Sequence, residues 1–246
     1  MRLAVISCVL FTRPLCRAVA QSKNDCRVWY VEQGLHNTPS AMPGKIQEIV
    51  DEIERLNAEA VEDRIKFKAI VLAYGLCSNG ICGVTAKDIP IIVPRTDDCI
   101  AIFLGSQKKY MKLFNDPGGI YWYNAAWFEQ ADIATDGYRE RLKAAYERDY
   151  DEETAEYLAD TIIGPLENYR YAVYITSQDD RTEYTEATKK AAKYFGWDYM
   201  DVEGDESMLK RLIDGEWDNE EEFLTVMPGQ SIEQSFDERK IKAQDV

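Results

Sequence analysis

The chain has 246 residues, of which 46% are apolar and 30% are charged, a composition typical of a globular protein with a buried core. Its formal net charge of −15 disfavours binding to nucleic acid or to an anionic membrane surface, because both need a basic footprint. No stretch approaches the roughly 18 apolar residues of a membrane span. Arg13 and Arg17 interrupt the apolar N-terminus, so we expect a buried strand there rather than an export signal.

Without an export signal, we expect a cytoplasmic protein in a reducing compartment. Its six cysteines are then thiols, metal ligands or redox groups rather than structural disulfides.

Strand-like apolar runs alternate with helical patterns along the chain, which predicts parallel βαβ units. In the first half, the predicted helices lie near 14–21, from Pro43 to Leu56, and from Asp98 to about Phe114. The predicted strands between them cover residues 2–10, 27–32, 69–73 and 89–93.

The second half begins with a turn at Pro117 that leads into an aromatic stretch at 120–123. One long charged helix is predicted over 137–161. The predicted strands that follow cover 172–176, 199–202 and 223–226, and the predicted helices cover 183–194 and 207–214. We therefore predict an α/β fold of open, mostly parallel sheets with helices on both faces. A change in composition near residue 135 suggests two lobes, 1–134 and 135–246, with a cleft between them, and a single domain is the alternative.

Three cysteines follow predicted strands. Cys8 ends the first strand, Cys77 follows the third, and Cys99 follows the fourth. Ligands of open α/β sheets bind outside the carboxyl ends of the strands, so thiols at that edge form a candidate soft-metal site. Packing as a small hydrophobic residue explains any one of these cysteines, but it explains the three together less easily. Their spacing does not match a zinc finger.

Glycines surround the second of these cysteines. Gly75 and Gly80, together with Asn79, allow tight turns and a close backbone approach to a bound cofactor. A plain turn between strand and helix explains the same residues equally well. Near the third cysteine, Asp98 is a candidate helix cap, which would place Cys99 in the first helical turn.

Two further residues are candidate catalytic groups. Arg95 is able to neutralise a bound anion, and His36, the only histidine, is a candidate ligand or proton carrier. For His36, a hydrogen bond to the loop backbone is the simpler alternative. Cys82 is a candidate fourth ligand, whereas Cys16 and Cys26 are interpreted as accessory. The chain contains no GxSxG elbow, Walker loop or GxGxxG segment, so nucleotide binding is unsupported.

Taken together, these motifs resemble the uncharacterised prokaryotic family known as domain of unknown function 1638, over nearly the full chain. The matching segments are Ile6-Ser7-Cys8, Leu35-His36-Asn37 with Pro39, Tyr74-Gly75-Leu76-Cys77-Ser78-Asn79-Gly80, Pro94-Arg95-Thr96-Asp97-Asp98-Cys99-Ile100, Leu104-Gly105-Ser106, Pro117-Gly118, Trp197-Asp198 and Pro228-Gly229. The resemblance implies a cytoplasmic α/β protein whose family motif includes Cys8, Cys77 and Cys99. It also implies relatives in anaerobes, near corrinoid-dependent methyl-transfer systems. One departure is Asp97, where the family tends to have histidine.

We therefore expect a metal-centre protein in which Cys8, Cys77 and Cys99 bind a metal and one coordination position stays open. A 4Fe-4S iron–sulfur cluster is favoured and zinc is the alternative. The expected context is anaerobic one-carbon or corrinoid-linked methyl metabolism, with a small-molecule substrate or a corrinoid protein as partner. A homo-oligomer is compatible with the sequence.

Two other functions are open. In the first, the chain is a corrinoid- or tetrapyrrole-binding module or chaperone without its own metal site. The aromatic residues at 121–123, Trp127 and Phe128 would then wall the pocket, although such residues also pack cores. In the second, the chain is a metal-free thiol enzyme with one activated cysteine.

Overall fold

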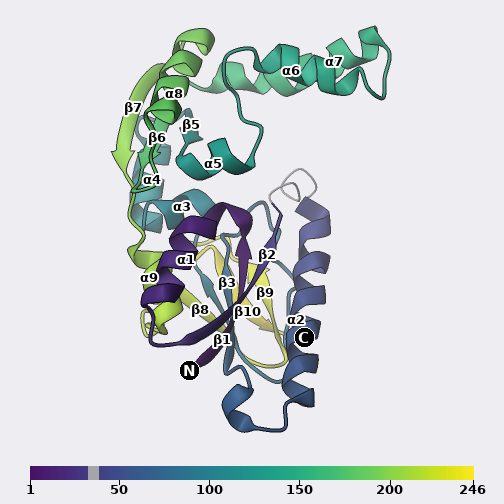
Figure 1. Ribbon diagram of the computed structural model, residues 1–246, viewed down its shortest axis with the longest axis vertical. Coiled ribbons are helices and arrows are strands. Elements are labelled where there is room, and N and C mark those ends of the chain that lie inside the picture. The colour runs from purple at the N-terminus through teal and green to yellow at the C-terminus, as the bar shows by residue number, and fades with distance from the viewer. Residues whose placement is uncertain (33–38) are drawn as a thin grey trace. The chain divides into compact units, whose positions relative to one another are not determined.

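The structure is a computed structural model that describes residues 1–32 and 39–246 (Figure 1). Contacts within the chain divide it into two units. The first comprises residues 1–110 and 205–246, and the second comprises residues 111–204. The predicted boundary after residue 134 falls inside the second unit, and the last part of the chain returns to the first.

The first unit contains an open five-stranded sheet with the order β2-β1-β3-β4-β8. Neighbouring strands among the first four pair in parallel, and β8 pairs with β4 in the antiparallel direction. The strands are β1 (Arg2–Cys8), β2 (Asp25–Val31), β3 (Ala69–Ala73), β4 (Ile91–Pro94) and β8 (Phe223–Val226). Every residue of β3 and β4 is buried, as expected for strands whose two faces are both covered. The predicted strands at 69–73 and 223–226 are confirmed at those bounds.

The strand order places a topological switch point between β1 and β3. The chain runs from β1 outward to β2 and then crosses to β3 on the other side of β1. Right-handed crossovers then put the two connecting helices on opposite faces of the sheet. Helix α1 (Thr12–Gln21) packs with α9 (Ser207–Asp214), and α2 (Met42–Glu59) lies across the sheet from them (Figure 1). The fold is therefore α/β with helices on both faces, as predicted.

The helix predicted from Asp98 to Phe114 is wrong as a single element. The structure contains α3 (Cys99–Phe103) and α4 (Gln107–Asn115). Gly105, with φ +69°, breaks the helix between them, in a conformation that glycine adopts at little cost. The Ser106 hydroxyl then accepts a hydrogen bond of 3.2 Å from the Lys109 N–H at the start of α4.

Two strands that the sequence analysis did not predict end the chain. β9 (Gln230–Gln234) and β10 (Ile241–Asp245) form an antiparallel hairpin. Thr85 makes an isolated antiparallel bridge to Ser231 of β9, which links the hairpin to the segment that follows the Cys77 loop.

The second unit is built on a three-stranded parallel sheet in the order β5-β6-β7. Its strands are β5 (Ile120–Tyr123), β6 (Tyr171–Thr176) and β7 (Asp198–Glu203), and helices α5 (Ala125–Gln130) and α8 (Thr182–Phe195) accompany them. The aromatic stretch contributes to the core of this unit. Tyr123 is fully buried, and Tyr121 stacks on Trp197 with ring centroids 5.4 Å apart.

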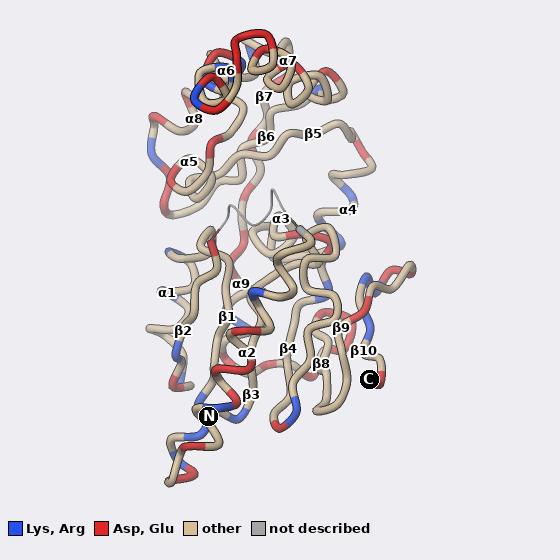
Figure 2. Tube along the Cα trace, turned by 90° about the vertical axis from the view of Figure 1, so that its right-hand side faces the viewer, with Lys and Arg blue, Asp and Glu red and all other residues tan. Residues whose placement is uncertain are grey.

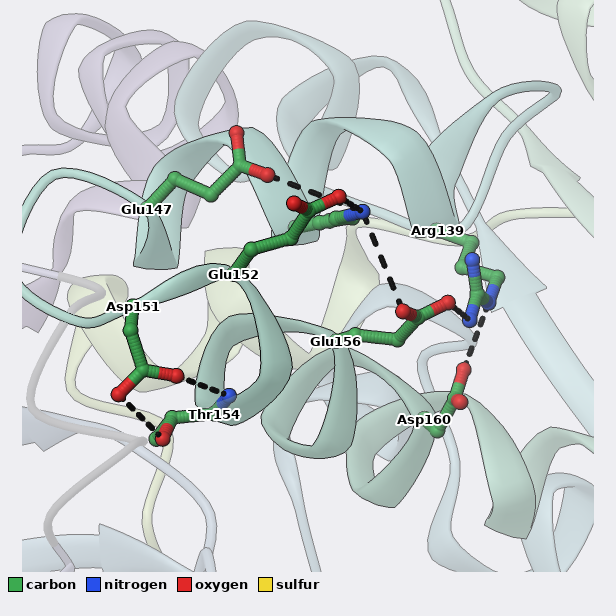
Figure 3. Close-up of polar contacts among 8 residues, drawn as sticks. Arg139, Glu147, Asp151, Glu152, Thr154, Glu156 and Asp160 are labelled. Atoms are coloured by element: carbon green, nitrogen blue, oxygen red, sulfur yellow. Dashed lines mark hydrogen bonds and ion pairs between the residues drawn. The ribbon is translucent and has the colours of Figure 1, made fainter.

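The long charged helix predicted over 137–161 is also wrong. The segment forms two helices, α6 (Tyr138–Tyr146) and α7 (Glu152–Ile163), which pack on each other. Asp151 starts the second helix because its carboxylate accepts a hydrogen bond of 2.9 Å from the Thr154 N–H. Arg139 links the two helices through contacts with Asp160 at 2.6 Å and Glu156 at 3.0 Å (Figure 3). Acidic residues are prominent along α7, whereas Glu140 is the one acidic residue of α6 (Figure 2).

In the described parts of the chain, no helix is both long enough and apolar enough to cross a membrane.

Candidate metal centre

The three cysteines at strand ends come from three neighbouring strands of the first sheet. Cys8 is the last residue of β1, Cys77 lies in the loop after β3, and Cys99 is the first residue of α3, which follows β4. All three are buried, with exposed fractions of 0%, 6% and 3%. They lie at the carboxyl edge of the sheet, where the switch point between β1 and β3 opens the ligand-binding crevice of such folds.

The structure brings these thiols together. The sulfur atoms of Cys77 and Cys99 lie 3.4 Å apart. Cys99 is also hydrogen bonded to Cys8. We call Cys8, Cys77 and Cys99 the thiol cluster. Hydrogen bonding to Cys77 and burial raise the pKa of the Cys99 thiol well above its usual range, although the contact with Cys8 opposes this shift. In the metal-free chain, Cys99 is therefore a neutral thiol at pH 7.

Backbone hydrogen bonds align the loop after β3 with the loop after β4. The N–H groups of Leu76 and Cys77 donate to the carbonyls of Thr96 and Asp97, each at 2.9 Å. The two loops touch at Gly75, where a Cβ atom would lie only 2.4 Å from the carbonyl carbon of Asp98. Only glycine fits this approach, so the residue at position 75 controls how closely the loop that carries Cys77 approaches Cys99.

The loop that carries Cys77 has an unusual backbone. Cys77, Ser78 and Asn79 have φ angles of +48°, +58° and +66°, three consecutive left-handed residues of which none is glycine. This conformation costs an L-residue about 1–2 kcal/mol. Strain of this kind persists only where the surrounding structure enforces it, and it is found preferentially at functional sites.

Asp98 fixes the start of α3. Its Oδ1 accepts a hydrogen bond of 2.8 Å from the Ile100 N–H, and its Oδ2 accepts one of 2.8 Å from the Tyr110 hydroxyl. The predicted cap is therefore confirmed, and Cys99 lies in the first turn of the helix. Burial raises the pKa of the Asp98 carboxyl. Neighbouring Asp97 contacts Gln107 at 2.6 Å and Lys240 at 3.3 Å.

Tyr74 is a member of the site that the sequence analysis missed. It directly follows β3, its exposed fraction is 1%, and its hydroxyl is hydrogen bonded to Cys8. Burial, followed by the proximity of the three cysteines, raises the pKa of the Tyr74 hydroxyl well above its usual range. Its place in the sequence was the available signal, because Tyr74 follows Ala73 just as Cys8 follows Ser7, the residue that pairs with Ala73.

The other residues predicted around Cys77 differ in their surroundings. Gly80 packs against α2, and a Cβ atom there would lie 2.5 Å from the sulfur of Met42. Asn79 is exposed, and its carbonyl accepts a hydrogen bond of 3.0 Å from the Cys82 N–H.

Arg95 is buried beside the C-terminal part of the first unit. Its Nε donates a hydrogen bond of 2.7 Å to the carbonyl of Glu220, and its Nη1 donates to the carbonyl of Ile241. Burial lowers the pKa of the guanidinium. Arg95 also lines an open cavity of about 160 Å³ together with Gln107 and Lys108. These contacts join β4 to the start of β10.

Cys16 and Cys82 make contacts with residues outside the thiol cluster. Cys16 is exposed and contacts the Tyr30 hydroxyl at 3.6 Å, and Cys26 is partly buried. The Cys82 sulfur accepts a hydrogen bond from the backbone of Gln234 in β9. None of the six cysteines forms a disulfide. His36, the remaining predicted candidate, lies outside the described residues.

The donor chemistry of the cluster suits a soft metal, because thiolates select zinc and iron–sulfur clusters. Within residues 1–32 and 39–246, no group of three or more His, Cys, Asp and Glu side chains is placed so that it could hold a metal ion. The sulfurs are packed as hydrogen-bonded thiols. A tetrahedral ion with metal–sulfur bonds of about 2.3 Å holds its thiolates about 3.8 Å apart. The separation of 3.4 Å between Cys77 and Cys99 is therefore close to what one ion needs.

Fold and site together define a doubly wound α/β protein with a buried thiol cluster at its switch point. Residues 30–213 match the model of the family described as "Protein of unknown function (DUF1638)", and the chain belongs to this family. The matched region contains Cys77 and Cys99, whereas Cys8 precedes it. No curated protein matches the chain.

Proposed function

We propose that this chain is a metal-centre protein in which Cys8, Cys77 and Cys99 bind a soft metal and leave one coordination position for substrate. The observation that carries the proposal is the contact of 3.4 Å between the sulfurs of Cys77 and Cys99. The third thiol, Cys8, is hydrogen bonded to Cys99 of this pair. Cys8 ends β1, and Cys77 and Cys99 follow β3 and β4, at the sheet edge where such folds bind ligands.

Packing alone is a weaker explanation of this arrangement. A buried cysteine that acts as a small hydrophobic residue needs no strained backbone. Here Cys77 begins a run of three left-handed residues, and that run holds its sulfur against Cys99. A loop that presents a metal ligand at a fixed position accounts for this strain, because strained backbone is retained where function requires a defined geometry.

The spacing of the sulfurs favours a single ion. Two thiolates on one zinc lie about 3.8 Å apart, so the pair at 3.4 Å needs only a small opening. In a cubane cluster each thiolate binds a different iron, so the sulfurs have to separate further. The all-thiol donor set favours such a cluster as the second candidate.

A thiolate-bound zinc with an open position acts as a Lewis acid toward a bound nucleophile. We accordingly propose methyl or acyl transfer as the reaction class, with one-carbon or corrinoid-linked metabolism as its setting. The fold excludes water from the cluster, since the three cysteines are at most 6% exposed. Asp98 orients the helix turn that carries Cys99. The residues after Cys77, Ser78 and Asn79, are exposed, and we propose that a substrate approaches from their side.

The test is to purify the chain without oxygen and to measure zinc, iron and acid-labile sulfide together with the visible spectrum. We expect about one zinc per chain without sulfide. Iron and sulfide near four per chain would instead establish the cluster. Absence of both, even after reconstitution, would overturn the proposal and make corrinoid affinity the next measurement.

Matched variants locate the metal. Cys77→Ala and Cys99→Ala each remove one sulfur of the contact pair, and we expect both to abolish stable binding. Cys16→Ala is the control, because Cys16 is exposed and contacts Tyr30 rather than the cluster. Full metal occupancy in Cys77→Ala would contradict the assignment.

A further inference from the structure

Tyr74 places a hydroxyl group at the thiol cluster. Ser7 of β1 pairs in register with Ala73 of β3, so the next residues along the two strands, Cys8 and Tyr74, lie side by side. Neighbouring residues at the same level of a parallel sheet project to the same face. The side chain of Tyr74 is 1% exposed, and a hydrogen bond joins its hydroxyl to the sulfur of Cys8.

The partner of this hydroxyl differs from those of the other buried tyrosines in the described residues. Three other buried tyrosines donate to oxygen, namely Tyr110 to Asp98 at 2.8 Å, Tyr174 to Asp180 at 2.9 Å and Tyr123 to the carbonyl of Ala134 at 2.5 Å. Tyr74 instead contacts sulfur. A neutral thiol is a weak acceptor, whereas a thiolate accepts a strong, charge-assisted hydrogen bond. The buried Tyr74 hydroxyl therefore makes a strong hydrogen bond only when the Cys8 sulfur carries negative charge.

We propose that Tyr74 donates a hydrogen bond to the metal-bound thiolate of Cys8 and thereby sets the metal affinity and the charge that this sulfur donates. The inference rests on the proposed function, because a metal holds Cys8 as a thiolate. Tyr74 acts through Cys8 and is a positioning residue. Its hydroxyl fixes the direction of the Cys8 side chain and withdraws charge from the sulfur, as hydrogen-bonding partners of metal ligands do.

The experiment titrates the metal-free full-length chain with Co²⁺ under anaerobic conditions and records the thiolate-to-cobalt absorption. The variant Tyr74→Phe keeps the ring but removes the hydroxyl. We expect it to bind Co²⁺ about 10–100-fold more weakly. Its thiolate-to-cobalt band should also move to longer wavelength, because a thiolate without the hydrogen bond gives up charge more readily.

Tyr123→Phe is the matched control. Tyr123 is a fully buried tyrosine of the second unit whose hydroxyl donates to a protein carbonyl. We expect its Co²⁺ affinity and spectrum to match those of the wild-type chain, since its hydroxyl has no role at the thiol cluster.

The outcomes separate the two proposals. If the wild-type chain binds no Co²⁺, the proposed function fails and this inference fails with it. If the wild-type chain binds and Tyr74→Phe has the same affinity and spectrum, only this inference is overturned. Metal-free Tyr74→Phe should unfold at the same urea midpoint as the wild type, because a neutral thiol makes only a weak hydrogen bond. Failure of that variant to fold would assign the hydroxyl a structural role and overturn the inference.

Discussion

The sulfur atoms of Cys77 and Cys99 lie 3.4 Å apart, although the two residues are separated by 22 positions in the sequence. Two backbone hydrogen bonds between their loops, from Leu76 to Thr96 and from Cys77 to Asp97, enforce this approach. Both thiols are buried, so the contact belongs to the interior of the first unit rather than to its surface.

This contact predicts a specific disulfide. We expect glutathione disulfide to oxidise the metal-free chain at Cys77 and Cys99. The two thiols lose two protons and two electrons, and the oxidant becomes two molecules of glutathione. The sulfurs need to close only from 3.4 Å to about 2.05 Å. Peptide mapping by mass spectrometry detects the linked peptides. Bound zinc should block the reaction, and linkage of Cys16 or Cys26 instead would contradict the prediction.

The raised pKa of Cys99 predicts how stability depends on pH. The unfolded chain ionises a cysteine near pH 8.5, whereas the folded chain holds the Cys99 proton to higher pH. The stabilisation is therefore complete below about pH 8.5 and is lost as the pH rises toward the folded-state value, with a slope of up to about 1.4 kcal/mol per pH unit.

Urea unfolding of the metal-free chain between pH 7 and pH 10 measures this slope. The variant Cys99→Ser should show a shallower decline above pH 8.5, because serine does not ionise in this range. Equal slopes for the two proteins would show that Cys99 titrates alike in the folded and unfolded chains.

A methyl group at position 75 should disrupt the centre. In Gly75→Ala the new Cβ would lie 2.4 Å from the backbone of Asp98, so the loops must separate. We expect a loss of about 1–3 kcal/mol in the free energy of unfolding and weaker zinc binding.

Gly44→Ala is the control for that variant. Gly44 lies in α2, and a Cβ atom there would meet nothing within 4 Å. Alanine should therefore stabilise the helix by up to about 1 kcal/mol and leave zinc binding unchanged. Similar effects of the two substitutions would refute the role given to the contact between Gly75 and Asp98.

Relief of backbone strain should stabilise the loop. Ser78 is exposed and has a φ angle of +58°, which glycine adopts without the penalty of a Cβ atom. We expect Ser78→Gly to raise the free energy of unfolding by about 1 kcal/mol in urea titrations. Gly83→Ala is the opposite case, because Gly83 has a φ angle of +80° with open space around it. We expect this substitution to lower the free energy of unfolding by about 1 kcal/mol. A destabilised Ser78→Gly variant would mean that the serine side chain, not the backbone, is what this turn needs.

Local patterns were sufficient to find most of the strands. A continuous apolar run placed β3 at its observed bounds, because residues buried on both faces are apolar at every position. Asp98 was identified as a cap from its place before an apolar helix. The two overlong helices failed because the charged and apolar spacing continues across Gly105 and across the turn before Asp151, where single residues end one helix and begin the next.

The sequence by itself determined the α/β alternation and the positions of Cys8, Cys77 and Cys99 at or after the ends of strands, because both follow from local hydrophobic patterns. Only the tertiary structure decided that β1, β3 and β4 are neighbours, that β8 joins them in the antiparallel direction, and that Tyr74 lies beside Cys8. Strand order is set by pairing between segments far apart in the chain, and no local pattern encodes which strands meet. The convergence of the three thiols is therefore a property of the assembled sheet.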